Sequence, residues 1–235
     1  MYTENTMRPN FFVALKLTNS QFVEMVKTIQ GGILIRDPAI SSCFTSPLKL
    51  HLTFFVLHLH NVEEINLASS TLDSCKFEIN SILTENISVD PFLEVGKFGS
   101  FGNRVLFISL KSTPMEKKIG SVVEILVEKF KQSGLLESSY ESQFVPHITI
   151  AKVRYGQKFK IKKSAYEGLD DLLGSIKLPV QEIDLLSMSS SDSFGYYESF
   201  MKVLICPQKK QLIPNVPPPP DDVSLALHLN RDELS

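Results

Sequence analysis

Two segments of the chain alternate apolar and polar residues with the period of two that is typical of a β-strand with one buried face. They run from Leu48 to Leu59 and from Phe144 to Val153. Shorter apolar runs indicate further strands. The additional expected strands are 11–17, 87–95, 105–110, 180–188 and 196–205.

Between these strands, apolar residues recur at intervals of three and four, which predicts helices. The first helix begins after an N-cap at Asn19 or Ser20 and stops at Gly31-Gly32. The other expected helices run from Val62 to about Leu83, from the capping box at Thr113 to Gly134, and from Tyr166 to Leu173. The glycine-rich residues 96–103 are expected to form a long hairpin loop.

Strands and helices alternate in two similar rounds, which predicts a duplicated α+β architecture rather than a single sheet. A chain of 235 residues fits one domain built of two lobes. We assign residues 1–206 to this domain. The prolines at 207, 214 and 217–220 predict that residues 207–235 form a flexible, proline-rich tail.

Charge and composition narrow the class of partner. The formal net charge is −2 and the sequence pI is about 6.2, whereas a protein that follows long nucleic acid carries a strong positive excess. Any nucleic-acid substrate is therefore expected to be short. The three cysteines are read as reduced thiols, and neither a transmembrane run nor a signal peptide is seen. We expect a monomer in the cytoplasm or nucleus, with no membrane partner.

One short motif occurs twice, as His51-Leu52-Thr53-Phe54 and His147-Ile148-Thr149-Ile150. Side chains alternate faces along a strand, so each histidine shares a face with the threonine two residues later. The apolar residues of each motif lie on the opposite, buried face. Two such strands placed side by side across a cleft would bring two imidazoles and two hydroxyls together.

This set suits cleavage of a phosphodiester by a neighbouring ribose hydroxyl. One neutral histidine removes the proton of the attacking hydroxyl, and the other, protonated, donates to the leaving oxygen. Thr53 and Thr149 donate to the non-bridging oxygens, where charge accumulates in the transition state. The chemistry requires no metal and no cofactor. The sequence leaves open which histidine is the base and which is the acid.

The paired motif resembles the signature of the two-histidine phosphoesterase superfamily, which includes bacterial RNA-ligase-like proteins and cyclic phosphodiesterases. The chain is also similar to the central domain of an A-kinase anchoring protein and its relatives, among them viral phosphodiesterases that degrade 2′,5′-oligoadenylate or cyclic GMP-AMP. The blocks that carry this similarity are Arg8–Phe12, Gly99–Asn103, Asp184–Met188 and Gly195–Tyr197. They span roughly residues 8 to 205.

The resemblance implies a bilobal, LigT-like α+β fold, with two antiparallel sheets and flanking helices around a central cleft. It implies metal-independent cleavage with a 2′,3′-cyclic phosphate as product. The anchoring proteins also bear an amphipathic helix that binds a kinase regulatory subunit. Here Leu225, Leu227 and Leu229 alternate with period two, so the tail does not favour kinase anchoring.

Several other residues are weaker candidates. Phe55 is expected on the face of His51, where it could stack on a base, and Tyr196 and Tyr197 are candidates for clamping a nucleobase. Lys152 has the parity of the buried residues, which argues against a direct role unless the strand bends. His58 and His60 lie two residues apart without an evident third metal ligand, so we read them as a solvated strand end.

The leading hypothesis is an enzyme that cleaves short 2′,5′-linked nucleotides, such as 2′,5′-oligoadenylate or 2′,3′-cyclic GMP-AMP. One alternative is a module that binds AMP-like nucleotides without turnover. Another is an RNA-end cyclic phosphodiesterase. The paired histidines favour an enzyme, because a binding module has no use for two proton-transfer groups.

Overall fold

The computed structural model describes residues 8–85, 90–141 and 144–206, and these residues form two antiparallel sheets of four strands each. Sheet A has the strand order β2-β1-β7-β8, and sheet B has the order β5-β4-β3-β6. The strands of sheet A are β2 (His51–Leu57), β1 (Phe11–Lys16), β7 (Glu182–Ser191) and β8 (Tyr197–Leu204). Those of sheet B are β5 (His147–Lys152), β4 (Val105–Leu110), β3 (Phe92–Phe101) and β6 (Lys177–Pro179).

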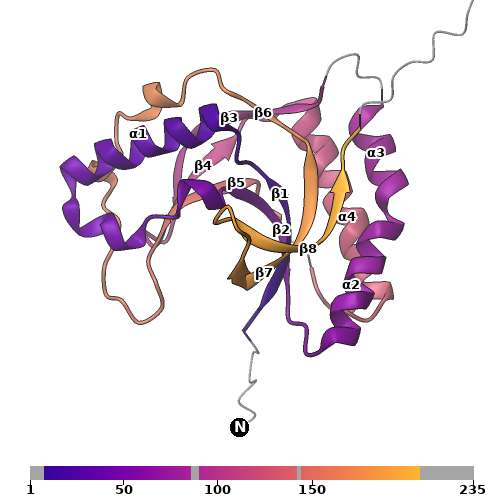
Figure 1. Cartoon of the computed structure of the whole chain (residues 1–235). Coiled ribbons are helices and arrows are strands. Elements are labelled where there is room, and N and C mark those ends of the chain that lie inside the picture. Colours follow the sequence, from indigo (N-terminus) through magenta and orange to yellow (C-terminus); the bar gives the residue numbers. More distant parts are fainter. Residues whose placement is uncertain (1–7, 86–89, 142–143, 207–235) are drawn as a thin grey trace, which may run out of the picture.

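Helices flank both sheets (Figure 1), and one of them contacts strands of each. α1 (Ser20–Arg36) lies over sheet B, whereas α2 (Val62–Ser74), α3 (Lys76–Thr84) and α4 (Pro114–Gln132) lie on the side of sheet A. α2 packs on β7 and β8, and α4 packs on β2 and β3. The cap at Thr113 forms as expected, because its side chain accepts a hydrogen bond from the amide of Glu116. Each helix of the described chain is too short or too polar to cross a membrane.

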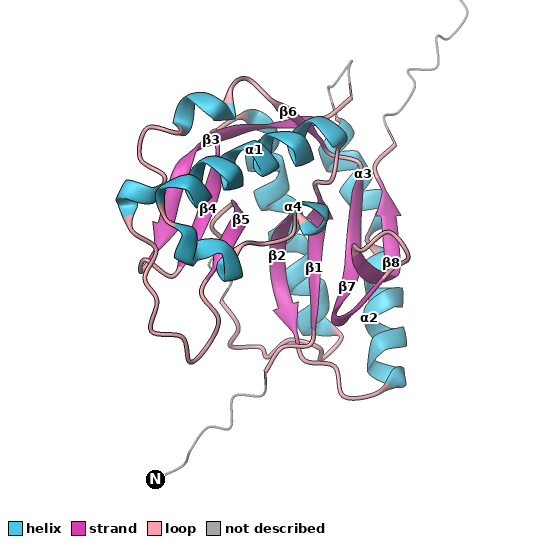
Figure 2. Ribbon diagram, turned by 60° about the vertical axis from the view of Figure 1, so that its left-hand side comes forward, coloured by secondary structure: helices cyan, strands magenta, loops and turns pink. Residues whose placement is uncertain are grey.

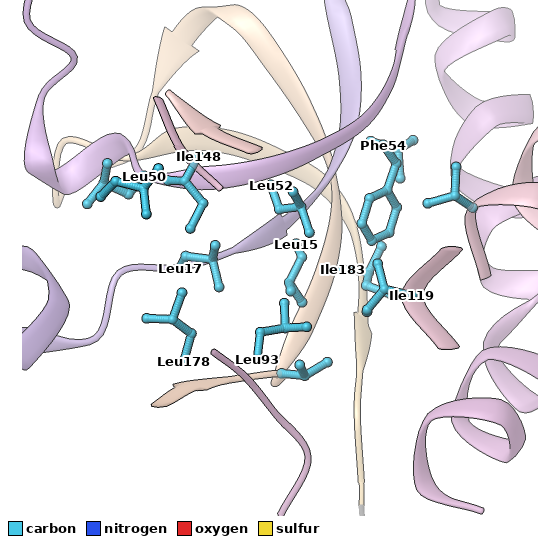
Figure 3. Packing of buried hydrophobic residues seen from close by; sticks show 14 of the residues in the cluster. Leu15, Leu17, Leu50, Leu52, Phe54, Leu93, Ile119, Ile148, Leu178 and Ile183 are labelled. Carbon is cyan, nitrogen blue, oxygen red and sulfur yellow. The ribbon is translucent and has the colours of Figure 1, made fainter. Parts of the chain in front are cut away.

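One hydrophobic core joins the two halves. Figure 3 shows Leu52 of β2 and Leu15 of β1 near Ile148 of β5 and Leu93 of β3, so that the buried faces of both sheets contribute to the same cluster. These side chains are almost completely excluded from water. Burial of a side chain of this size contributes about 1.5–3 kcal/mol, so the core fixes the two sheets relative to each other.

The two edge strands that begin with a motif histidine lie where the sheets meet (Figure 2). β2 is the first strand of sheet A, β5 is the first strand of sheet B, and their Cα atoms come within 8 Å of each other. Phe44, just upstream of β2, also forms an antiparallel bridge to Ala151 of β5. The predicted fold class, two antiparallel sheets with flanking helices, is confirmed.

The first helix does not stop at Gly31-Gly32, as the sequence suggested, but continues to Arg36. Ile33 explains the continuation, because it extends the buried stripe of Ile29 by one turn and is fully buried. Asp37, followed by Pro38, then ends the helix. The predicted helix from Val62 to Leu83 is divided at Cys75 into α2 and α3.

Two further expectations on local structure were wrong. The glycine-rich residues are largely a strand, because β3 runs on to Phe101 and the turn comes only at Gly102 and Asn103, both with positive φ. The segment 166–173 forms a short 3-10 turn at Asp170–Leu173 instead of an α-helix. The expected tail, and with it the question of kinase anchoring, lies outside the described residues.

Candidate active site

The two motif strands share an irregularity that the sequence did not predict. In β2, Thr53 pairs with Ala14 and Phe55 with Val13, so Phe54 is an extra residue, a β-bulge. In β5, Thr149 pairs with Phe107 and Ala151 with Leu106, so Ile150 is the extra residue. Both bulges fall on the fourth residue of the motif. Each one reverses the parity of the strand that follows it.

The bulge in β5 is held from outside the sheet. The side-chain amide of Gln30, which is buried in α1, donates to the carbonyl of the bulged Ile150 at 3.1 Å and to the carbonyl of Thr45 at 2.8 Å. The amide of Thr45 also donates to the Ile150 carbonyl, at 3.0 Å. These hydrogen bonds satisfy buried polar groups. Because a buried polar group without a partner is costly, the bulge is a fixed feature of the fold.

His51 begins β2 between two aromatic rings. Its ring centroid lies 4.9 Å from that of Phe12 and 5.5 Å from that of Tyr197. Lys49 also holds Tyr197, since its ammonium lies 4.6 Å from the ring centroid and donates to the hydroxyl of Ser191 at 2.8 Å. His51 therefore lies in a largely apolar niche, contributed by three strands of sheet A.

His147 begins β5 and also has two aromatic neighbours. Its centroid lies 5.0 Å from Phe101 and 5.4 Å from Phe107, and these two rings stack on each other at 4.3 Å. Gly99 makes this arrangement possible, because a Cβ at this position would lie 2.3 Å from the Phe107 ring. The glycine of this strand is thus needed for close packing of the ring beside His147.

The two imidazoles are oriented in the same way. Nδ1 of His51 lies 2.8 Å from the carbonyl oxygen of Lys49, and Nδ1 of His147 lies 2.7 Å from that of Val145, two residues upstream in each case. A carbonyl oxygen can only accept a hydrogen bond, so each Nδ1 carries a proton and donates it. Each Nε2 is then the nitrogen available for proton exchange with a substrate.

The electrostatics of the two histidines differ. Burial lowers the pKa of His51 to about 4, although its hydrogen bond to the Lys49 carbonyl acts in the opposite direction. The positive charges of His147 and Lys152 lower this pKa further. The strands that begin with these two histidines have Cα atoms within 8 Å of each other, so the structure brings the two halves of the motif pair together.

Lys152 reaches the face of the histidines because of the bulge. After the extra residue at Ile150, Ala151 turns into the core and Lys152 becomes exposed on the side of Thr149. The strand therefore has the bend that a direct role of Lys152 requires. The corresponding residue of β2 is Val56, so only one of the two halves carries a cation at this position.

The same parity change places Phe55 differently from its prediction. Phe55 is only 3% exposed and packs edge-on against Phe130 of α4, at a centroid distance of 5.1 Å. The expectation that it shares the face of His51 was wrong, because the bulge at Phe54 turns Phe55 toward the core. This position leaves Phe55 no access to a base.

The two candidate tyrosines differ in their exposure. Tyr197 is partly exposed beside His51, and its role in clamping a nucleobase stays a prediction. Tyr196 is only 4% exposed and packs with Phe12 and Ala14, so its burial argues against a base contact. The sequence analysis did not single out Phe12, Phe101 or Phe107, although the close spacing of aromatics and glycines in Gly99–Phe107 was a signal of close packing.

The two remaining histidines of the strand end lie apart from this site. The rings of His58 and His60 contact each other at a centroid distance of 4.6 Å, and Nδ1 of His58 bonds to the carbonyl of Arg8. These contacts fit the reading of a solvated strand end.

Two antiparallel sheets that meet at edge strands, each starting with His-x-Thr, define the class as the two-histidine phosphoesterase superfamily. Solved structures of similar fold include E. coli LigT complexed with 3′-AMP, with a TM-score of 0.51 and 17% identity over 84% of this chain and 98% of LigT. The PDE domain of MHV ns2 has a TM-score of 0.50 and 13% identity over 77% of this chain and 100% of that domain.

Within this superfamily, the chain belongs to the AKAP7 2′5′ RNA ligase-like domain family, which it matches over residues 9–205. It is similar to human A-kinase anchor protein 7 isoform gamma, with 28% identity over 207 residues. That alignment covers 84% of this chain and 58% of the human protein. The chain thus spans a little over half the length of this relative.

Proposed function

We propose that the protein is a metal-independent phosphodiesterase that cleaves short 2′,5′-linked nucleotides, with His51 and His147 as its proton-transfer groups. The observation that carries this proposal is the equivalent orientation of the two histidines, which begin neighbouring edge strands and each direct Nδ1 to a backbone carbonyl, so that Nε2 is left for proton exchange. Family membership and the LigT-like fold support a phosphodiesterase. The 2′,5′ linkage and the individual roles of the residues are our own assignment.

In the proposed reaction, the ribose hydroxyl next to the phosphate is the nucleophile. A 2′,5′ linkage leaves a free 3′-hydroxyl, which loses its proton to one histidine and attacks the phosphorus. The O5′ of the next nucleoside leaves and takes a proton from the other histidine. The products are a 2′,3′-cyclic phosphate and a 5′-hydroxyl. Each histidine contributes about 10²–10⁴-fold to the rate by general acid–base catalysis.

Thr53 and Thr149 would stabilise the charge on the non-bridging oxygens. Each lies on the histidine face of its strand, before the bulge, and each is partly exposed. Their hydroxyls are small donors on rigid strands, which is the arrangement that favours preorganised stabilisation of a transition state. Lys152 adds a positive charge to the same face.

The aromatic pairs suit the two nucleosides of a short substrate. Tyr197 beside His51 and Phe101 beside His147 are both partly or largely exposed, and aromatic rings stack on any base without a strong sequence preference. The overall charge of −2 supports a short nucleotide over long RNA. 2′,5′-Oligoadenylate and 2′,3′-cyclic GMP-AMP both meet these conditions.

The test is to incubate the purified protein, in excess chelator, with 2′,5′-linked triadenylate, 3′,5′-linked triadenylate and 2′,3′-cyclic GMP-AMP. We expect loss of the substrates that contain a 2′,5′ bond and persistence of 3′,5′-triadenylate. His51→Ala and His147→Ala should each abolish cleavage, whereas the matched control His58→Ala should keep it.

Other outcomes identify the alternatives. Tight AMP binding with all three substrates intact would indicate a nucleotide-binding module instead of an enzyme. Conversion of RNA ending in a 2′,3′-cyclic phosphate, with the 2′,5′ bonds untouched, would indicate an RNA-end phosphodiesterase. Activity that survives both histidine substitutions would contradict the mechanism for any substrate.

A further inference from the structure

Although the two histidines have the same orientation, their surroundings differ. His51 is enclosed by Phe12, which is buried, and by Tyr197, whose ring also contacts the Lys49 ammonium. The neighbours of His147 are more open, because Phe101 is 41% exposed. A positive charge is therefore harder to solvate on His51 than on His147.

The charged groups around His51 act in the same direction. Lys152 comes to this face through the bulge at Ile150, and no acidic side chain is among the groups whose charges act on His51. Its cross-strand neighbour Lys16 is also a cation, although Glu182 pairs with Lys16 at 3.0 Å. When the histidine pair holds one proton, the apolar enclosure of His51 by Phe12 and Tyr197 disfavours its location there.

The Nδ1 hydrogen bonds of the two histidines show which role each ring can take at Nε2. With Nδ1–H donating to the carbonyl of Lys49, a neutral His51 presents the lone pair of Nε2, which accepts a proton. A protonated His147 has one N–H donating to the carbonyl of Val145 and presents a second N–H at Nε2, which donates a proton.

We propose that the site is directional: His51 is the general base and His147 the general acid, so that the nucleoside carrying the attacking hydroxyl lies over sheet A and the leaving nucleoside lies over sheet B. This inference rests on the proposed function and specifies how the substrate lies in the same site. In-line displacement requires the attacking and leaving oxygens on opposite sides of the phosphorus. The base and acid histidines then mark the two ends of the substrate.

The proton balance follows from this orientation. The 3′-hydroxyl gives its proton to Nε2 of His51 as the O3′–P bond forms. The P–O5′ bond breaks, and O5′ receives the proton from Nε2 of His147. The enzyme ends with a protonated His51 and a neutral His147, and exchange with water restores the initial state. Tyr197 then borders the attacking nucleoside, and Phe101 borders the leaving one.

The test uses a substrate whose leaving group needs no acid. Adenosine 2′-(4-nitrophenyl phosphate) keeps the attacking 3′-hydroxyl, but nitrophenolate leaves without protonation. Rates are measured for this ester and for 2′,5′-diadenylate with the wild type, His51→Ala and His147→Ala. His51→Asn and His147→Asn serve as second variants, because the asparagine amide can still donate to the backbone carbonyl.

We expect the His147 variants to lose about 10²–10⁴-fold on the diadenylate but no more than about tenfold on the nitrophenyl ester. The His51 variants should lose about 10²–10⁴-fold on both substrates. His58→Ala should match the wild type throughout. The reverse pattern, or equal losses of the two histidine variants on both substrates, overturns the directional assignment. A wild type that cleaves neither substrate refutes the proposed function itself, and the direction with it.

Discussion

The β2 half and the β5 half of the candidate site have the same local geometry but different environments. In both, a histidine opens an edge strand, donates Nδ1–H to a carbonyl two residues upstream, and is followed by a bulge at the fourth motif residue. They differ at the residue two positions after the bulge, which is Val56 in one half and Lys152 in the other. They also differ in the enclosure of the histidine.

This difference shows how a duplicated fold can support two opposite tasks. The shared backbone geometry places two chemically identical groups against one substrate. Burial lowers the pKa of His51, which suits the base in a site where an acid and a base must act together. If the comparison is correct, substitutions at equivalent positions should have similar effects where the halves agree and different effects where they do not.

After the histidines themselves, the largest effect is expected where the halves agree, at the two threonines. Thr53→Val and Thr149→Val preserve the shape of the side chain but remove a donor to the non-bridging oxygens. Each should lower kcat by about 10²–10³-fold with little change in KM. Steady-state kinetics on 2′,5′-diadenylate measures this, with Thr28→Val on the outside of α1 as the control. An effect of only one threonine would break the equivalence of the halves.

A smaller effect is expected at the aromatic neighbours. Tyr197→Ala and Phe101→Ala each remove a ring on which a base can stack, an interaction worth about 1–3 kcal/mol, so KM for the diadenylate should rise about 10–100-fold. Tyr155→Ala, at a tyrosine that is almost fully exposed, should leave KM unchanged. Unaltered KM values in both site variants would mean that the bases lie elsewhere.

A further effect is expected at Lys152, the position at which the two halves differ. The base must be neutral, so kcat/KM should fall as the pH drops through the His51 pKa of about 4. Lys152→Gln removes a neighbouring positive charge, which should move this acid limb to higher pH and lower the rate by about tenfold. The matched variant Val56→Gln should shift nothing. An acid limb near pH 6.5 in the wild type would contradict the enclosure of His51.

The smallest effect is on stability, and it concerns Asp184 of β7, a buried carboxyl in sheet A. Asp184 is 1% exposed, its Oδ1 accepts from Ser199 at 2.7 Å, and its Oδ2 has no hydrogen-bond partner. Burial raises its pKa to about 6. The folded pKa lies above the unfolded value, so stability is lost as the pH rises from about 4 through 6.

Asp184→Asn should therefore raise the free energy of unfolding by roughly 1–3 kcal/mol at pH 8 and by less at pH 4.5. Urea denaturation at the two pH values measures the difference, with the exposed Asp171→Asn as the control. A gain that does not depend on pH would show that ionisation of Asp184 is not its cause.

The sequence was sufficient to predict the motif strands and the shared face of each His–Thr pair, because these depend on local alternation of residues, whereas the two antiparallel sheets were implied by the resemblance to a known superfamily. It failed at Phe55 and at Lys152, since one extra residue per strand reverses the parity and depends on partners such as Gln30 that are distant in the chain. The consecutive apolar pairs Phe54-Phe55 and Ile150-Ala151 were the available signal.

The aromatic surroundings of the histidines could not be predicted for a related reason. Phe101 meets His147 because β5 pairs with β4. Phe12 and Tyr197 come from β1 and β8, so these contacts depend on a strand order that is set by long-range pairing. The first helix was misjudged at Gly31-Gly32, because the burial of Ile33 outweighs the low helix propensity of glycine, about 1 kcal/mol per residue.

The most direct test of the central claim is the identity of the first product formed from 2′,5′-diadenylate in excess chelator and in water labelled with ¹⁸O. Attack by the neighbouring 3′-hydroxyl gives adenosine 2′,3′-cyclic phosphate without label, and mass spectrometry of early time points should find this species and adenosine. A linear adenosine monophosphate that carries ¹⁸O from the earliest time point would mean that water attacks directly, which would contradict the proposed two-histidine mechanism.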